Sequence, residues 1–251
     1  MLRLENIDIT LGKGTKLERK ILNQLNIDVK EGEFVVVIGE NGAGKSSLFN
    51  VISGFITPDS GKIFIMQRDV TSTSQLQRAK LISKVMQDPK IGTIENMTIS
   101  ENMAFALNRG QNRGLKLFTN RDRTSLFKEK LSMGNIGLEN CLDEMVSNLS
   151  GGQRQILSII MAMLQDSKIL LLDEITAALD PASSEVIMKL TNQIVRKQKL
   201  TCIMITHNMN HAIQYADKIL LLKNGTFIKE YGENDITTLT PFALAAEFDA
   251  I

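Results

Sequence analysis

Short apolar runs, many of them rich in valine and isoleucine, recur along the chain and predict β-strands. These runs lie near residues 2–11, 21–29, 34–38, 63–66, 169–172, 201–205, 218–222 and 226–229. Over residues 1–30 apolar and polar positions alternate, which is typical of an antiparallel sheet with one exposed face. The later runs are almost continuously apolar, as in strands that are buried on both faces of a parallel sheet.

Two segments between the later strands have helical patterns. Residues 151–165 are apolar almost all round, and residues 182–198 carry an apolar stripe. Strand, helix and strand in succession predict an α/β fold with a mainly parallel sheet covered by helices, to which the N-terminal strands add an antiparallel β subdomain.

The stretch 91–148 is more polar and helix-compatible, and we interpret it as a helical insertion into the α/β core. Within it, Thr98 to Glu101 is typical of a capping box that opens a helix. The sequence NRGQNRG at 108–114 predicts a loop. Near the C-terminus, Thr240 and Pro241 predict the start of a last helix.

Composition limits the classes of partner. The chain has 251 residues, 43% of them hydrophobic, which is enough for a packed core. Its 29 basic and 28 acidic residues leave a formal charge of +1, so no nucleic-acid partner is expected and phosphate binding has to be local. No apolar run approaches the roughly 20 residues that span a bilayer, and we expect a cytoplasmic protein. Cys141 and Cys202 are isolated, and both are expected to be buried thiols.

A glycine-rich loop between a strand and a helix is the first candidate site. The run FVVVIGENGAGKSS at 34–47 matches the phosphate-binding loop pattern in its required context. The expected nucleotide-binding residues are Gly39, Glu40, Asn41, Gly42, Ala43, Gly44, Lys45, Ser46 and Ser47. Backbone amides would surround the phosphates, Lys45 would reach the outer ones and Ser46 would ligate Mg²⁺. The plain alternative is a glycine turn without a ligand.

A second candidate site is the strand KILLLDEI at 168–175, which ends in two carboxylates. Asp173 is placed to hold Mg²⁺, and Glu174 is placed to take a proton from an attacking water. Taken alone, the same pattern would also fit a buried strand that ends in an acidic turn.

The run Leu149, Ser150, Gly151, Gly152 and Gln153 resembles the signature motif of the ABC ATPases, the nucleotide-binding subunits of ABC transporters. Hydroxyl and amide groups at a helix start suit an anion such as a γ-phosphate. The resemblance implies a P-loop NTPase core with an inserted α-helical signature subdomain. It also implies a head-to-tail dimer of two copies, in which this motif acts on the ATP that the other copy holds.

Other family motifs follow in order. Gln87 resembles the Q-loop glutamine that contacts Mg²⁺, Asp180 resembles the D-loop aspartate, and His207 resembles the switch histidine that holds the γ-phosphate. The resemblance thus implies ATP and Mg²⁺ as cofactors, with Glu174, His207 and Gln87 in catalytic roles. It also implies one ABC ATPase domain over 1–251. Its core with the β subdomain would comprise 1–90 and 151–235, its helical subdomain 91–150 and its tail 236–251.

Several positions depart from the family pattern. Leu11 stands where an aromatic residue usually stacks on adenine, so adenine would pack against an aliphatic side chain or bind elsewhere. Ile175 replaces a frequent proline, and the run IIMAML lacks a frequent arginine. None of these changes removes an expected catalytic group.

The chain's two histidines, His207 and His211, raise the alternative of a metal pair. That alternative requires both on one helix face together with a third ligand, and the sequence indicates neither. His207 follows an apolar strand, where parallel sheets present ligand-binding residues, so we expect it to be functional and His211 to be a bystander.

The resemblance implies a transporter subunit that drives an integral membrane permease from the cytoplasmic side, and the stretch after Gln87 would receive the permease. The chain is similar to importer-type subunits linked to amino-acid uptake. This similarity implies import of a small solute, and it implies a substrate-binding protein as an indirect partner. The alternative is a soluble ABC ATPase of the iron–sulfur assembly type. The sequence does not identify the substrate.

Overall fold

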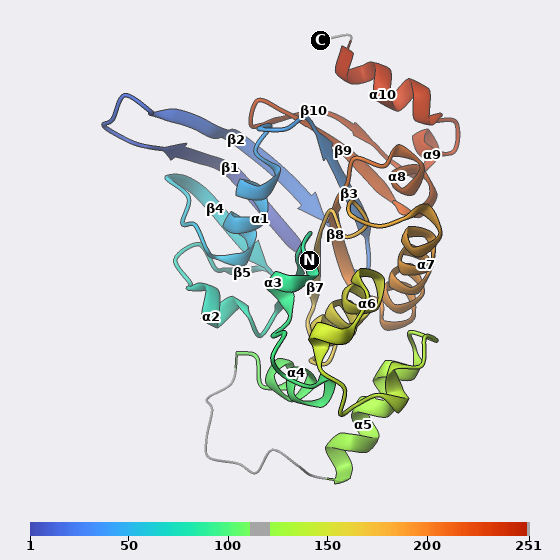
Figure 1. Cartoon of the computed structure of the whole chain (residues 1–251). Helices are drawn as coiled ribbons and strands as arrows, with labels where there is room; N and C mark the ends of the chain where they lie inside the picture. Colours follow the sequence, from blue (N-terminus) through green and yellow to red (C-terminus); the bar gives the residue numbers. More distant parts are fainter. Residues whose placement is uncertain (111–120, 250–251) are drawn as a thin grey trace. The chain divides into compact units, whose positions relative to one another are not determined.

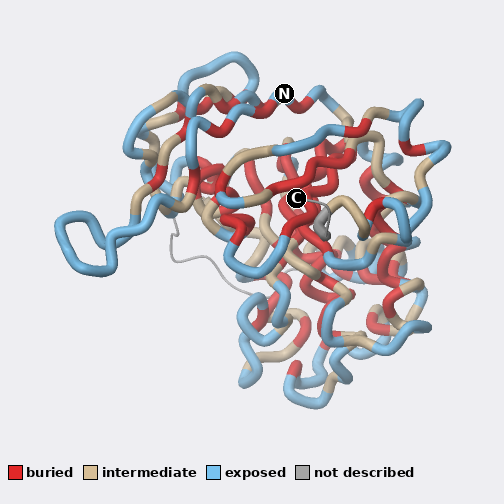
Figure 2. The backbone as a smooth tube through the Cα atoms, turned by 90° about the horizontal axis from the view of Figure 1, so that it is seen from above, coloured by how far each residue is buried: buried red, intermediate tan, exposed pale blue. Residues whose placement is uncertain are grey.

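The computed structural model describes residues 1–110 and 121–249, and the chain divides into two compact units (Figure 1). The first unit comprises Met1–Arg78 and Gln198–Ile251, and the second comprises Ala79–Lys197. Exposed residues lie mainly in the connecting loops, whereas buried residues are concentrated along strands and helices (Figure 2). None of the helices in the described part is long and apolar enough to cross a membrane.

The first unit contains an antiparallel sheet in the order β2-β1-β4-β5. Its strands are β1 (Leu2–Leu11), β2 (Arg19–Val29), β4 (Ser60–Ile65) and β5 (Arg68–Asp69). Burial alternates along β2, as the sequence pattern predicts for a sheet with one exposed face. The expected antiparallel β subdomain is therefore confirmed.

The same unit holds a second group of strands around β3 (Phe34–Gly39). β3 pairs in parallel with β8 (Thr201–Ile205) and β9 (Lys218–Lys223), and β9 pairs antiparallel with β10 (Thr226–Tyr231). Every residue of β3 and β8 is buried, which agrees with their continuous apolar runs. The helices of this unit are α1 (Lys45–Ser53), α2 (Gln75–Arg78), α8 (Met209–Tyr215), α9 (Glu233–Ile236) and α10 (Pro241–Asp249).

The second unit pairs β6 (Ile82–Val85) in parallel with β7 (Ile169–Asp173). Its α-helices are α3 (Pro89–Gly92), α4 (Ile99–Leu107), α5 (Arg121–Ser132), α6 (Gly151–Ala162) and α7 (Pro181–Gln198). Single 3-10 turns cover Leu138–Asn140 and Val146–Asn148. The helical character expected for 91–148 is thus confirmed in the described residues, and the α/β class is confirmed for the chain.

Helix starts follow the predicted cap chemistry. Thr98 and Glu101 form the expected capping box at the start of α4. At α10, the Thr240 hydroxyl accepts a hydrogen bond from the amide of Ala243 at 3.1 Å, as the pair Thr240 and Pro241 predicted.

One prediction was wrong and one lies partly outside the described residues. Cys202 is buried in β8, but Cys141, which directly follows the 3-10 turn Leu138–Asn140, is exposed. Of the expected loop at 108–114, positions 111–114 are outside the described residues.

Candidate nucleotide site

The phosphate loop connects the buried strand β3 to the helix α1 in the first unit. Gly42 and Gly44 have φ values of 84° and 107°, a backbone region that favours glycine. A Cβ atom at Gly44 would also lie 2.9 Å from the carbonyl oxygen of Ile21. Both observations explain why this turn needs glycine. The helix α1 begins at Lys45, directly after the loop.

Lys45 is folded back onto the loop that it follows. Only 7% of the residue is exposed, and its Nζ donates hydrogen bonds to the carbonyl oxygens of Gly39 at 2.6 Å and Glu40 at 3.0 Å. The Lys45 ammonium is held here by neutral carbonyl oxygens. An anionic phosphate bound in the loop would attract it more strongly.

The structure brings His207 to Lys45, although 162 positions separate them in sequence. The Nζ of Lys45 and the Nε2 of His207 lie 3.2 Å apart. Because a lysine ammonium only donates, this contact requires Nε2 to accept, which is the tautomer with the proton on Nδ1. One residue, Thr206, separates His207 from the end of β8. The amide of Thr206 donates to the carbonyl oxygen of Val37 in β3 at 3.4 Å.

His211 has different surroundings from His207. It is buried in α8, where its amide donates to the side chain of Asn208 at 3.1 Å. Its ring centroid lies 6.1 Å from that of Tyr215. Because α8 begins at Met209, His207 lies outside the helix and the two histidines do not share one helix face.

Leu11 ends β1 and is 46% exposed. Across the sheet it pairs with Arg19, the guanidinium of which lies 3.9 Å from the position that a Cβ would take at Gly42. An exposed aliphatic side chain and an arginine thus lie at the edge of the sheet that the phosphate loop approaches.

The two expected carboxylates follow β7 in the second unit. Asp173 is its last residue, and its Oδ2 lies 3.5 Å from the Nζ of Lys84 on the neighbouring strand β6. Glu174 has a φ of 46°, a left-handed value that is uncommon for residues other than glycine. Seven other non-glycine residues in the described part also have a positive φ, so this value does not by itself assign a role to Glu174, which stays a prediction.

The signature run begins α6 with a reciprocal cap. The Ser150 hydroxyl accepts a hydrogen bond from the amide of Gln153 at 3.3 Å, and the Gln153 side chain accepts one from the amide of Ser150 at 3.0 Å. Leu149 precedes the cap, and Gly151 and Gly152 form the first turn of a helix of 12 residues. The start of this helix carries the partial positive charge that favours an anion.

Gln87 and Asp180 are also in the second unit. Gln87 is exposed after β6 and precedes Asp88, which caps α3 by accepting from the amide of Lys90 at 2.9 Å. Asp180 accepts a hydrogen bond from the amide of Ser183 at 2.9 Å, and hydrogen bonding from Ser183 lowers the pKa of its carboxyl. Asp180 thus caps the start of α7, besides any role in a D-loop.

Sequence reasoning missed three basic residues that support these segments: Lys84 beside Asp173, Arg154 behind the signature, and Arg78 under the end of α1. Arg154 and Arg78 are 5% and 1% exposed. The available local signal was the position of Arg154 directly after the signature; Lys84 in β6 and Arg78 in α2 offered none. Each residue also has a partner more than 25 positions away, which no local pattern indicates: Asp173 for Lys84, Glu95 for Arg154 and Val51 for Arg78.

Comparison with known proteins agrees with these features. The family model described as ABC transporter matches residues 22–177, which is more than half of the chain. The chain is 39% identical over 249 residues to the tyrosine transport ATP-binding protein of Clostridioides difficile (strain R20291), covering 99% of each. It is 32% identical over 225 residues to a thiamine import ATP-binding protein of Photorhabdus laumondii, covering 90% of this chain and 88% of that protein.

Solved structures show the same likeness. A dimeric ATP-binding cassette in a post-hydrolysis state, bound to ADP and Pi, gives a TM-score of 0.80 and 29% identity, covering 93% of this chain and 99% of that chain. The ADP conformation of a cassette of an ABC transporter gives a TM-score of 0.82 and 25% identity, covering 100% and 98%. The fold is therefore that of the P-loop NTPase cassettes. The named relatives belong to transport systems and give no support to the assembly alternative. The chain belongs to the ABC transporter family as an ATP-binding cassette, the type of ATPase that serves transport systems.

Proposed function

We propose that this chain binds and hydrolyses ATP to drive the import of a small solute, such as an amino acid, through a separate integral membrane permease. The observation that carries the proposal is the 39% identity to a tyrosine transport ATP-binding protein over 99% of both chains. On this proposal the protein works at the cytoplasmic face of the membrane, held there by the permease, and a substrate-binding protein acts indirectly. The domain organisation given above for 1–251 belongs to the same proposal.

ATP binding would begin at the phosphate loop. Amides between Gly39 and Ser47 would bind the phosphates, and Lys45 would exchange its carbonyl contacts for phosphate oxygens. Leu11 would lie against adenine, since its side chain is exposed at the end of β1.

The residues proposed for Mg²⁺ are Ser46, Gln87 and Asp173. Their hydroxyl, amide and carboxylate groups are all oxygen donors, which is the ligand type that Mg²⁺ prefers. Bound there, the ion would neutralise charge on the phosphates. Mg²⁺ would have to compete with the Lys84 ammonium, which lies 3.5 Å from Asp173 Oδ2.

Hydrolysis would depend on two further side chains. Glu174 would accept a proton from the attacking water. His207 would donate a hydrogen bond to the γ-phosphate from Nε2 once that phosphate replaces its contact with Lys45, which requires Nε2 to carry a proton. Two copies would associate head to tail, so that Leu149 to Gln153 of one copy contact the ATP of the other and Asp180 lies at their interface. The dimeric state of a solved relative supports this arrangement.

The test is transport by proteoliposomes that contain this chain with its permease. Uptake of a radiolabelled amino acid should require ATP and should fall to background with Glu174→Gln, which removes the proton acceptor and keeps the shape. Nucleotide binding should survive in that variant but not in Lys45→Ala. Full hydrolysis by Glu174→Gln would overturn its role. A complex that hydrolyses ATP but moves no amino acid would overturn the substrate class.

A further inference from the structure

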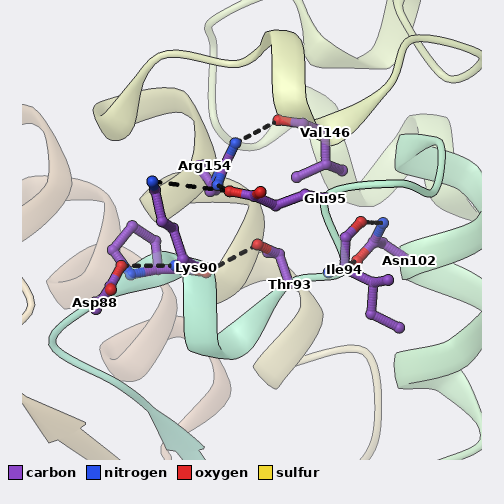
Figure 3. A network of polar contacts seen from close by, with 9 residues as sticks. Asp88, Lys90, Thr93, Ile94, Glu95, Asn102, Val146 and Arg154 are labelled. Carbon is purple, nitrogen blue, oxygen red and sulfur yellow. Dashed lines mark hydrogen bonds and ion pairs between the residues drawn. The ribbon is translucent and has the colours of Figure 1, made fainter.

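Arg154 connects the signature helix to a segment that precedes it by many residues (Figure 3). It lies in the first turns of α6 and is 5% exposed. Its Nη1 donates to the Oε1 of Glu95 at 2.6 Å, and its Nη2 donates to the carbonyl oxygen of Val146 at 2.9 Å. One guanidinium therefore holds both the segment after Gln87 and the loop that leads into the signature.

The backbone joins the same two segments. The amide of Ser147 donates to the carbonyl oxygen of Glu95 at 3.2 Å, and the amide of Val146 donates to that of Met97 at 3.0 Å. Glu95 is thus fixed by its main chain to the residues just before the signature, and by its side chain to the helix just after it.

The charges favour this arrangement. The hydrogen bond from Arg154 holds the pKa of the Glu95 carboxyl below its ordinary value. A second cation, Lys90, lies 3.9 Å from the same oxygen but is 68% exposed, so its contribution is small. Arg154 is consequently the main partner of Glu95.

The outer side of the Glu95 segment is open. Ile91 is 68% exposed and Ile94 is 37% exposed, whereas Asn102 on α4 fixes the backbone of Ile94 through hydrogen bonds of 2.7 Å and 3.0 Å. A displacement of this segment would therefore move Glu95, because the backbone between them is ordered. Movement of Glu95 would in turn displace Arg154, to which it is hydrogen-bonded.

We propose that Glu95 and Arg154 form a positioning pair that fixes the start of the signature helix relative to the segment after Gln87. Movement of either segment is passed to the other through this pair. Loosening the pair misplaces Ser150 and its neighbouring amides for the second copy's ATP without altering the phosphate loop. The inference rests on the proposed function, in which the signature acts across a dimer.

Glu95→Gln and Arg154→Lys test the pair, since each keeps polarity and nearly the original size. Both are made in the Glu174→Gln background, in which ATP-driven dimers accumulate. Light scattering against ATP concentration measures dimerisation, and titration with a fluorescent ATP analogue at low protein concentration measures binding to one subunit. Lys168→Met is the matched control, because its ion pair with Asp166 is exposed and lies in the same unit.

Each pair variant should weaken dimerisation by roughly three- to tenfold, less than a fully buried charged hydrogen bond would give, because the Glu95 side chain is 46% exposed. Analogue binding should stay within about twofold of the parent, and the double variant should lose no more than the worse single variant, because one interaction is removed in each case. The control should match the parent in both measurements.

The outcomes separate the two proposals. If the parent does not dimerise with ATP, the proposed ATP-sandwich dimer is wrong. If the parent dimerises and Glu95→Gln dimerises equally well, the positioning pair is wrong while the function stands. Additive losses in the double variant would also overturn the pair, and a parallel loss of analogue binding would show general misfolding instead of positioning.

Discussion

Replacing Arg78 with methionine is expected to destabilise the first unit strongly, because all the hydrogen-bonding groups of this buried guanidinium are used. The residue is 1% exposed. Its acceptors are the Thr73 hydroxyl at 2.9 Å and the carbonyl oxygens of Val51 at 2.6 Å, Ile52 at 2.9 Å, Val70 at 2.6 Å and Thr71 at 3.1 Å.

The magnitude follows from two opposing terms. A hydrogen bond to a charged group contributes about 1.5–3 kcal/mol, so five of them contribute roughly 7–15 kcal/mol before costs. Burial of the cation, which also lowers the pKa of Arg78, costs several kcal/mol. Methionine removes the cost as well as the bonds, but it leaves carbonyl oxygens buried without donors. We expect a net loss of about 3–5 kcal/mol for Arg78→Met and about 2 kcal/mol for Arg78→Lys, which retains the charge with fewer donors.

Urea unfolding followed by circular dichroism measures this loss as a change in the free energy of unfolding. Arg68→Lys is the control, because Arg68 is exposed on the short strand β5. A midpoint for Arg78→Met equal to that of the parent, at an unchanged m-value, would refute the reasoning. So would an Arg78→Lys variant less stable than Arg78→Met.

Three further predictions concern single positions. Gly44→Ala should lose nucleotide binding in an ATP titration, since a Cβ would lie 2.9 Å from a backbone oxygen at a φ of 107°; binding within twofold of the parent would contradict the strain argument. Leu11→Tyr should tighten ATP binding severalfold, because stacking on adenine adds about 1 kcal/mol; unchanged affinity would place adenine elsewhere. The pKa of Asp8 is lowered to about 2, mainly by its hydrogen bond with Lys20. Because the folded pKa lies below the unfolded one, the stability that Asp8 contributes is present above about pH 4 and is lost as the pH falls toward 2. Asp8→Asn should therefore remove about 1–2 kcal/mol at pH 7 and less at pH 3 in urea unfolding; equal losses at both would contradict the assignment.

The strands that the sequence predicted are those with long apolar runs. All of them occur in the structure, and β3 and β8 are buried at every position, as their composition indicates. The apolar runs did not predict β5 or β6. β5 has only two residues, and β6 interrupts its apolar positions with Ser83 and Lys84, so neither offers a run long enough to detect.

Local motifs predicted on which secondary-structure elements the candidate site residues lie, where one segment supplies the pattern. The glycine loop, the Ser150 cap and Asp173 at the end of β7 lie where their patterns placed them. Pairings between distant segments were not predictable in the same way. The contact of Lys45 with His207 depends on the parallel pairing of β3 with β8, and the contact of Lys84 with Asp173 depends on that of β6 with β7.

Cysteine shows a limit of composition as a guide. An isolated thiol is most often buried, and Cys202 follows that rule because it sits in a strand buried at every position. Cys141 does not, because its position is set by a short turn and not by an apolar run. Its neighbour Leu142 is buried, so exposure changes within one residue, which residue type alone does not predict.

The two helices whose starts are proposed to meet phosphate share a feature at their other ends. The last turn of α1 presents the carbonyl oxygens of Val51 and Ile52 to Arg78, and the last residue of α6 presents that of Ala162 to Arg109 at 3.3 Å. A cation at a helix C-terminus is favourable because the aligned peptide dipoles leave a partial negative charge there. The same dipoles make the N-terminus attractive to an anion. Burial lowers the pKa of both arginines, which makes each of them costly to keep. Each arginine donates to the helix end and to several other carbonyl or hydroxyl oxygens, and these hydrogen bonds offset the cost of burying its charge.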